Sequence, residues 1–335
     1  MIRFGVIGTG WITDSFIEAA SFDKRASFTA VFSRNIETAK AFAQKHNIKN
    51  AFDNIDSMCK CAEVDAIYIG SPNFCHHEQA IICMNHKKHV ICEKPLASNH
   101  KHAEEMVSCA NLNNVVLMEA MRLTPSPVFK AIMDAINDPK TGKSKIGKIH
   151  KFVSLFCQFS SKFERFKAGG DFNSLSRKSA GGCLMDIGVY TIYPMVCMFG
   201  EPKSIQCVGS LFSQDGIDIE ATIICGYDDQ KSCTLISSKV SNSIGCSEIQ
   251  GEDGTILIDK MSTFKSAKIV YRDGHEEELC TSQYKNDMVY EVTEFIDVIT
   301  SGRKESSINS HKNSLITMKI LDEARRQIGI DPSIY

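Results

Sequence analysis

The stretch AGGCLMDIGVYTIYPM, residues 180–195, places two polar side chains inside an apolar segment. Apolar residues such as Leu184 and Ile192 recur at roughly helical spacing, which predicts a largely buried helix. Asp186 and Tyr190 are four residues apart and should share one face of it. A buried carboxylate is costly unless it is paired or hydrogen-bonded. This face is therefore either a wall that binds a hydroxyl substrate or a polar pair that hydrogen-bonds the backbone inside a core.

A second chemical signal is the glycine turn GTGWIT, residues 8–13, which follows the apolar run IRFGVI. The first glycine permits a tight turn, the second lets the backbone approach a pyrophosphate, and the following helix directs its N–H groups at the anion. Thr13 stands where a third small residue is usual. The expected cofactor contacts are Gly8, Thr9, Gly10, Trp11 and Ile12.

The choice between NAD and NADP depends on the end of the second strand. An NAD site places an acid there for the ribose 2′-hydroxyl, whereas an NADP site prefers a cation. Here the strand is followed by Ser33 and Arg34, and the first acid is Glu37. Ser33 can donate to a 2′-phosphate, and Arg34 can pair with it or stack on the adenine. The sequence favours NADP and leaves NAD possible, since Arg34 could simply point into solvent.

Length and composition describe the frame that must position these residues. A chain of 335 residues is too long for one ordinary core, so we expect two domains. The net charge of −2 argues against a nucleic-acid-binding surface. We find neither a signal peptide nor a membrane-spanning run, which predicts a cytoplasmic protein. The 14 cysteines are then expected to be reduced thiols that pack in the core.

Potential metal ligands are densest in CHHEQAIICMNHKKHVIC, residues 75–92. This segment contains neither the CxxC nor the HExxH spacing of known zinc sites. His76 and His77 are adjacent and would point about 100° apart on a helix. We therefore predict no metal site.

The order of elements divides the chain near residue 122. Up to that point, strands at 2–7, 28–32, 65–70, 89–93 and 115–119 alternate with helices, which predicts a doubly covered parallel sheet. Short strands then follow without long helices between them, which predicts a mostly antiparallel open sheet in residues 123–335. We expect a Rossmann domain at 1–122 and a substrate-binding and oligomerisation domain at 123–335. The C-terminal helices of the second domain should pack back toward the first.

Taken in order, the segments GTGWI, SPNFCH, CEKPLA and AGGCLMDIGVY resemble the glucose–fructose oxidoreductase, inositol dehydrogenase and MocA family. The resemblance covers nearly the whole chain, and the EKP tripeptide together with the GGxxxDxGxY run is specific to the family. Tyr190 in place of His is similar to the dimeric dihydrodiol dehydrogenase branch. Many members of that branch carry an Arg five residues after the Glu of MEA. Here Arg122 follows Glu119 by three, so we assign it no cofactor role.

This resemblance implies functions for further residues. Ser71, Asn73 and His76 would line the cofactor, Glu93 and Lys94 would lie beside the nicotinamide ribose, and Pro95 would close the turn, often in the cis form. Tyr190 would be the proton donor. A free Tyr, with a pKa near 10, is a poor donor at neutral pH, so a cation such as Lys94 would have to lower its pKa. Asp186 would bind a substrate hydroxyl or hold Lys94 in place.

These observations lead to a functional hypothesis and one rival. We expect an NAD(P)-dependent oxidoreductase that moves a hydride between nicotinamide and a hydroxyl or ketone of a sugar, polyol or dihydrodiol. We also expect a homodimer or higher homo-oligomer and no nucleic-acid or membrane partner. The rival is a non-catalytic sensor that binds a dinucleotide on the same fold. Retention of both Lys94 and Tyr190 favours the enzyme, because a sensor does not need a proton donor.

Overall fold

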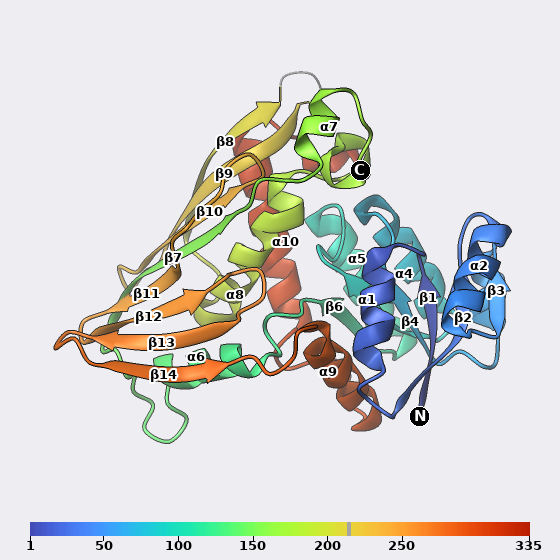
Figure 1. The fold of residues 1–335 in the computed structure, drawn as a ribbon, viewed down its shortest axis with the longest axis horizontal. Helices are drawn as coiled ribbons and strands as arrows, with labels where there is room; N and C mark the ends of the chain where they lie inside the picture. The colour runs from blue at the N-terminus through green and yellow to red at the C-terminus, as the bar shows by residue number, and fades with distance from the viewer. Residues whose placement is uncertain (213–215) are drawn as a thin grey trace. The chain divides into compact units, whose positions relative to one another are not determined.

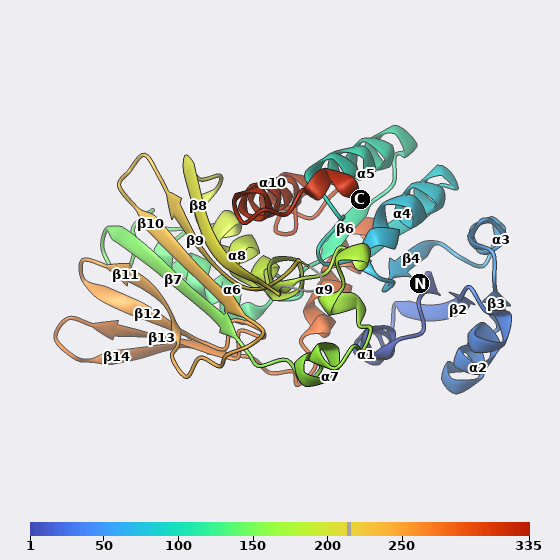
Figure 2. The same cartoon turned by 90° about the horizontal axis from the view of Figure 1, so that it is seen from above.

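The computed structural model describes residues 1–212 and 216–335, and it divides into two compact units (Figures 1 and 2). Unit 1 consists of Met1–Arg122 and Asn286–Leu315. Unit 2 consists of Leu123–Lys285 and Ile316–Tyr335. Each unit has its own sheet and is described by itself.

Unit 1 is a Rossmann fold, as the sequence predicts. Its sheet has six parallel strands in the order β3-β2-β1-β4-β5-β6. The strands are β1 (Ile2–Ile7), β2 (Ala26–Phe32), β3 (Asn50–Phe52), β4 (Ala66–Ile69), β5 (His89–Glu93) and β6 (Leu117–Ala120). The order reverses between β1 and β4, and open α/β sheets bind ligands beyond the strand ends at such a point.

Helices cover both faces of this sheet. They are α1 (Trp11–Ala20), α2 (Ile36–His46), α3 (Ile55–Lys60), α4 (His76–Asn85), α5 (His100–Asn113) and α9 (Met288–Thr300). The last of these comes from far along the chain and packs against α1. Phe4, Phe16 and Phe295 meet in the core, with centroid distances of 5.8 Å from Phe4 to Phe16 and 6.0 Å from Phe4 to Phe295. This aromatic contact shows why α9 belongs to unit 1.

Unit 2 contains an eight-stranded sheet in the order β14-β13-β12-β11-β7-β10-β9-β8. Of its strand pairs, β7 with β10 is parallel, and the others are antiparallel. The strands are β7 (Ile149–Cys157), β8 (Ser204–Phe212), β9 (Ile217–Gly226), β10 (Ser232–Ser238), β11 (Ser247–Gly251), β12 (Gly254–Asp259), β13 (Ser266–Tyr271) and β14 (Glu276–Thr281). The mostly antiparallel open sheet that the sequence predicts is confirmed.

One face of this sheet is covered by helices (Figure 2). They are α6 (Pro127–Ile136), α8 (Val189–Phe199) and the part of α10 (His311–Gln327) that lies in unit 2, and a short helix α7 (Phe163–Lys167) lies in the loops. Cys225, Cys233 and Leu235 point to the covered side and are buried. Their neighbours alternate in burial, and Ile224 is 46% exposed. Apolar and polar residues alternate poorly along these strands because both faces of the sheet carry apolar residues.

The segment that begins with AGG is less regular than the sequence predicts. Leu184–Gly188 forms a π-helical turn, and the α-helix α8 starts only at Val189. Asp186 therefore lies in the wide turn and Tyr190 in the regular helix, so the simple four-residue spacing of one α-helix does not describe them. Turns of this kind are frequent at functional sites.

One helical stretch, Arg177–Phe199, is long and apolar enough to cross a membrane by length and composition. However, 72% of its most apolar window is buried inside the protein. Ile192 and Met195, for example, are completely buried. This burial is what the core helix of a folded domain requires.

All 14 cysteines are free thiols, in agreement with the sequence prediction. More than half of these cysteines are buried, as expected for thiols that pack in a core. Cys246 departs from this expectation, because it is exposed in the segment before β11.

Candidate functional site

Gly8 and Gly10 of the first turn are glycines for different structural reasons. Gly8 has a φ of 102°, and a Cβ there would lie 2.8 Å from the carbonyl oxygen of Gly70. Gly8 is therefore required by the fold itself. Gly10 is the N-cap of α1 with a φ of −88°, and a Cβ on it would have no atom within 4 Å. The protein leaves open space at Gly10, and the N-cap makes no side-chain hydrogen bond. This space and the helix N-terminus suit the pyrophosphate of a dinucleotide.

The unusual Thr13 is accommodated by a glycine on the neighbouring strand end. Thr13 is completely buried, and a Cβ on Gly70 would lie 2.9 Å from its Oγ1. Gly70 thus supplies the space that a third small residue on α1 would otherwise provide. Trp11 is 69% exposed on the first turn of the helix, whereas Ile12 packs against the core of unit 1. Of these two predicted contacts, Trp11 is the one whose ring is accessible.

Ser33 and Arg34 follow β2 directly, as the sequence predicts. Ser33 is half-buried, and its N–H donates to the carbonyl oxygen of Phe52 at 3.1 Å. Arg34 is exposed. Asn35 caps α2 by accepting from the N–H groups of Glu37 and Thr38 at 2.9 and 3.1 Å. The cap fixes where the chain turns, so that a hydroxyl and a guanidinium lie at the strand end where a 2′-phosphate would be bound.

His76 holds two loops of unit 1 together. Its Nε2 lies 2.9 Å from the carbonyl oxygen of Ser71, and its Nδ1 lies 3.0 Å from that of Pro95. The ring is completely buried, and burial lowers the pKa of His76 while the carbonyl contacts act in the opposite direction. Because a neutral ring donates from only one nitrogen, one contact at a time is a hydrogen bond. His76 therefore fixes the positions of Ser71 and Pro95, and it is too deeply buried to line a cofactor with its own ring.

Ser71 and Asn73, the other predicted cofactor contacts in this loop, lie closer to solvent than His76. Both are partly accessible. The Ser71 hydroxyl donates to Gln79 Oε1 at 2.6 Å, and the Asn73 carbonyl oxygen accepts from Ser98 Oγ at 3.4 Å. Both therefore lie in the loop between β4 and α4, at the switch point of the sheet.

The EKP tripeptide ends β5, and the Lys94–Pro95 bond is cis, as the family resemblance implies. Glu93 is 8% exposed and accepts a hydrogen bond from the Tyr68 hydroxyl at 2.8 Å. Burial raises the pKa of Glu93, whereas the charge of Lys94 and the Tyr68 hydrogen bond act to lower it. Lys94 is half-buried beside this carboxyl. The neighbouring acid is thus fixed inside the protein while the lysine remains accessible.

Several buried carboxyl groups surround Glu93, and no sequence motif singled them out. Burial raises the pKa of Glu119 to about 7, and its Oε1 accepts from the Leu96 N–H at 3.0 Å. Burial also raises the pKa of Asp287 and of Glu291. Arg122 lies 3.5 Å from Asp287, and its charge acts to lower the pKa of both. Arg122 therefore serves as a cation for this acidic group.

In unit 2, the glycines of AGGCLMD allow two close approaches. A Cβ on Gly181 would collide with the carbonyl oxygen of Asn173, and one on Gly182 would collide with the carboxylate of Asp218. Gly182 also has a φ of 113°, which L-residues rarely adopt. Asp218 is completely buried and accepts from the Leu184 N–H at 2.6 Å. Burial raises the pKa of Asp218, and the hydrogen bond from the Leu184 N–H acts to lower it. The carboxyl group thus satisfies the start of the helix.

Asp186 has a lysine partner within unit 2. Lys239 Nζ lies 2.7 Å from Asp186 Oδ2 and donates to the carbonyl oxygen of Ser174 at 2.8 Å. The side chain of Lys239 is 4% exposed and that of Asp186 is 33% exposed. The carboxylate therefore has its charge balanced from the protein side and one part open to solvent. Lys239 was not singled out from the sequence, where its only signal is a lysine directly after the apolar strand SCTLISS.

Tyr190 lies in the first turn of α8, two residues after the π-helical segment ends at Gly188. It is 7% exposed, and its ring packs on Phe156 with a centroid distance of 5.6 Å. Phe156 holds the ring in place from β7. Of the predicted catalytic residues, Asp186 and Tyr190 thus lie in unit 2, whereas Lys94 belongs to the EKP turn of unit 1.

Comparison with known protein families gives two matches. Residues 2–121 match the family "Oxidoreductase family, NAD-binding Rossmann fold", and residues 142–257 match the "GFO/IDH/MocA C-terminal domain". Among curated proteins, scyllo-inositol 2-dehydrogenase (NADP(+)) IolU of Bacillus subtilis is 46% identical over 330 residues, covering 98% of both chains. Trans-1,2-dihydrobenzene-1,2-diol dehydrogenase of Xenopus laevis is 28% identical, also over 98% of both chains.

Solved structures share the fold. A 3-ketoreductase from Actinomadura kijaniata, KijD10, in complex with NADP and TDP-benzene, superimposes with a TM-score of 0.81 at 21% identity over 97% of both chains. An oxidoreductase from Agrobacterium radiobacter in complex with NAD+, L-tartaric acid and magnesium gives a TM-score of 0.81 at 16% identity over 99% of both chains. With the two family matches and the glycine turn, these results show that the chain belongs to the GFO/IDH/MocA family of NAD(P)-dependent oxidoreductases.

Proposed function

We propose that this protein is an NADP-dependent dehydrogenase that acts on a secondary hydroxyl of a cyclic polyol, or on the matching ketone. The observation that carries the proposal is the 46% identity, over 98% of both chains, to a relative named scyllo-inositol 2-dehydrogenase (NADP(+)). A hydroxyl-rich ring needs charged side chains that accept and donate hydrogen bonds. The partly exposed Asp186, fixed by Lys239, offers such a carboxylate.

Three residues would carry the chemistry. Oxidation removes a hydride from the carbon and a proton from the hydroxyl, and a bound nicotinamide would supply the hydride acceptor. Tyr190 as the phenolate would take up that proton, and as the neutral phenol it would return a proton to the ketone oxygen in the reverse direction. Lys94 would supply the positive charge that brings the Tyr190 pKa closer to neutrality and stabilises an alkoxide. Asp186 would accept a hydrogen bond from a neighbouring substrate hydroxyl.

Lys239 would be a positioning residue for Asp186. Its ammonium is almost completely buried, so it is a poor candidate for direct contact with substrate. It binds the carboxylate on one side and the Ser174 carbonyl on the other, which leaves Asp186 in one orientation. His76 is a poor substitute for the proton donor because its ring is completely buried between two carbonyl oxygens.

The preference for NADP over NAD rests on Ser33 and the exposed Arg34 at the end of β2. These residues would hold the 2′-phosphate, and the first turn of α1 at Gly10 would hold the pyrophosphate. Titration of NADPH and NADH into wild type and Arg34→Ala, followed by nicotinamide fluorescence, tests the preference. We expect Arg34→Ala to weaken NADPH binding and leave NADH binding unchanged. A wild type that prefers NADH would refute the assignment.

The decisive experiment for the reaction is a substrate panel with NADP+ and NADPH. It should contain scyllo-inositol, other inositols, sugars, a trans-dihydrodiol and the corresponding ketones. Turnover of an inositol with kcat/KM well above that of the dihydrodiol would support the proposal. The dihydrodiol is the second candidate, because relatives named trans-1,2-dihydrobenzene-1,2-diol dehydrogenase are 25–28% identical along the chain. Binding of NADPH without turnover of any compound would favour the sensor.

We further propose that the protein forms a homodimer through the uncovered face of the unit 2 sheet. In residues 1–212 and 216–335, no helix of unit 2 covers that face (Figure 2). Val208 is 78% exposed and Ile224 is 46% exposed, and the half-buried Ile236 and Leu155 lie on the same side. An apolar surface of this kind is typical of a protein–protein interface.

Sedimentation velocity at micromolar concentration tests the dimer. We expect Val208→Glu to produce monomers. Leu112→Glu is the matched control, because Leu112 is 85% exposed on α5 of unit 1 and should leave the dimer intact. A wild type that sediments as a monomer would refute the interface. That the protein is cytoplasmic and has no nucleic-acid or membrane partner stays a prediction from composition.

A further inference from the structure

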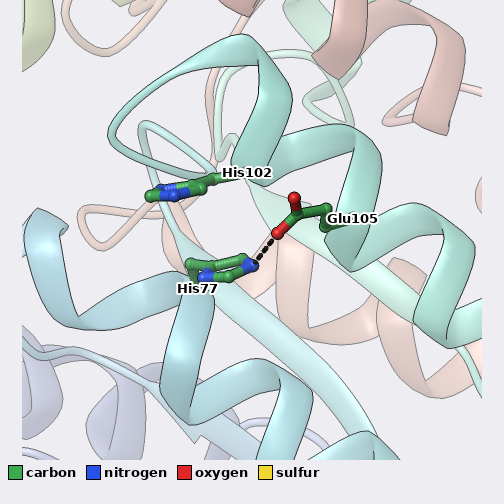
Figure 3. Close-up of side chains that lie close together, drawn as sticks. All are labelled: His77, His102 and Glu105. Atoms are coloured by element: carbon green, nitrogen blue, oxygen red, sulfur yellow. Dashed lines mark ion pairs between the residues drawn. The ribbon is translucent and has the colours of Figure 1, made fainter. Parts of the chain in front are cut away.

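Three potential metal ligands meet between α4 and α5 of unit 1 (Figure 3). His77 comes from the first turn of α4. His102 and Glu105 come from α5 and are three residues apart, so they share one face of that helix. The two helices pack side by side, which brings His77 onto this face. The group thus combines a pair of ligands on one helix with a third from its neighbour.

The distances suit a small cation. One ligand atom from each residue can be chosen so that all three lie within 4.8 Å of one another. His77 Nε2 is 2.8 Å from Glu105 Oε2. Nitrogen and oxygen ligands lie about 2.0–2.2 Å from Zn²⁺, so their mutual distances in a tetrahedral site are roughly 3.3 Å. The group therefore needs a contraction of about 1–1.5 Å at most.

The two imidazoles require a rearrangement before they can share an ion. The rings of His77 and His102 are stacked with centroids 4.2 Å apart and an interplanar angle of 10°. An imidazole lone pair lies in the ring plane, so two parallel rings cannot direct theirs at one point. One ring must rotate out of the stack. Both residues are half-buried, and the Glu105 side chain is 46% exposed, so this rotation would take place at a partly solvent-exposed position.

The charges around the group are mixed. Glu105 brings the negative charge that a cation site needs, and both histidines lie within the first three residues of their helices. Lys101, 3.9 Å from Glu105, is a competing cation, but its side chain is 81% exposed and is held only weakly there.

We propose that His77, His102 and Glu105 form a binding site for a divalent transition-metal ion, with Zn²⁺ as the probe. Two imidazoles and one carboxylate are ligands that suit zinc and its neighbours, and a water would complete the coordination. The ion would link the N-terminal turns of α4 and α5. The sequence predicted no metal site because segment 75–92 supplies only His77, and the other two ligands lie beyond it on α5.

Equilibrium dialysis of metal-free, untagged protein against Zn²⁺ tests the proposal. Wild type should bind one more equivalent of Zn²⁺ than either His102→Ala or Glu105→Gln, or should bind that equivalent far more tightly. Outer-shell partners of a metal are worth about 10- to 100-fold in affinity, so loss of a direct ligand should cost at least about tenfold. His86→Ala is the matched control, because His86 also pairs with a carboxylate, Asp56 at 2.7 Å, yet belongs to no such three-residue group among the described residues.

Proton NMR of the imidazole rings distinguishes the proposed site from Zn²⁺ bound by thiols and from a simple ion pair. Zn²⁺ should shift the resonances of His77 and His102 as their stack opens, and should leave those of His86 in place. Equal Zn²⁺ binding by wild type and His102→Ala would mean that thiols bind the ion, and it would overturn the proposal. Resonances that respond to pH but not to Zn²⁺ would also overturn it, since the group is then only an ion pair. Normal NADPH binding and circular dichroism would show that the variants are folded.

Discussion

The proposed cofactor site in unit 1 and the proposed substrate site in unit 2 are formed in different ways. The proposed cofactor site in unit 1 consists mainly of backbone: the Gly8 turn, the N-terminus of α1 and loops held by His76. The proposed substrate site in unit 2 is built by side chains that meet across long stretches of chain. Lys239 is paired with Asp186 and with Ser174, and Asp218 caps the helix start at Leu184.

The contrast also concerns charge. Behind the EKP turn, unit 1 buries several carboxyl groups whose pKa values are raised by burial. In unit 2, burial likewise raises the pKa of Asp218, whereas the partly exposed Asp186 is balanced by a buried lysine. Under the proposed function, the cofactor-binding part of unit 1 would be specified mainly by local geometry, whereas the substrate-binding part of unit 2 would depend on paired side chains. Substitutions in each unit can test the two sides of this contrast.

The largest effect is expected at Tyr190. Tyr190→Phe keeps the ring on Phe156 and removes the hydroxyl, so folding and NADPH affinity should be retained. Turnover should fall by about 10² to 10⁴, which is typical for the loss of a positioned proton donor. Lys94→Met should cost a comparable factor, and the double variant should lose less than the product if both act on the same proton. Near-normal turnover of Tyr190→Phe would refute the assignment.

The glycines separate structural from cofactor effects. Gly182→Ala forces a Cβ against Asp218 at a positive φ and should cost about 3 kcal/mol or more of unfolding free energy. Gly10→Ala meets no protein atom within 4 Å, so it should change stability by less than about 1 kcal/mol and mainly weaken NADPH binding. Urea unfolding and fluorescence titration of both variants provide the comparison. A Gly10→Ala protein with full NADPH affinity would contradict the proposed pyrophosphate site.

Lys239→Met tests the pair that orients Asp186. We expect kcat/KM to fall by about 10- to 100-fold, mostly through KM, because the partly exposed Asp186 would lose the buried ammonium that orients it. Lys239→Arg should recover part of the loss. The control is Lys231→Met at the other end of β10, where Lys231 pairs with Asp229 at 2.9 Å. If Lys231→Met impairs kcat/KM equally, the effect is one of strand stability.

The smallest effect concerns the buried acid Glu119. Its pKa is about 7 in the folded state against 4.5 for the ordinary group, so folding favours the protonated form. The resulting contribution to the free energy of unfolding is fully present below pH 4.5 and is lost as the pH rises through 7. Between pH 6 and 8 this loss is about 1 kcal/mol. Glu119→Gln should remove this loss in urea unfolding, whereas Glu37→Gln at an exposed position should not. An unchanged pH dependence would show that Glu119 ionises normally.

Much of the fold could be predicted because it depends on neighbours in the chain. Five of the six strands of unit 1 and the glycine turn follow from short runs and motifs, and the cis Lys94–Pro95 bond is what the family resemblance implied. The short strand β3 and the short helix α3 were not predicted. The mostly antiparallel sheet of unit 2 was also predicted. The π-helical turn at Leu184–Gly188 was not, because apolar spacing does not distinguish a wide turn from a regular one. The sequence predicted that the C-terminal helices pack back toward the first domain, but not that α9 packs on α1 in particular, because this contact joins distant segments.

By itself, the sequence determined the Rossmann topology, the position of the dinucleotide turn and the residue types at the ends of β2 and β5. These features depend on backbone conformation and hydrophobic period, which a short window contains. The tertiary structure alone decided that Lys239 pairs with Asp186, that Asp218 caps Leu184 across 34 residues, and that His102 and Glu105 meet His77. It also decided which carboxyl groups lose contact with water, because burial is a property of the packed chain and shifts a pKa only once the core has formed.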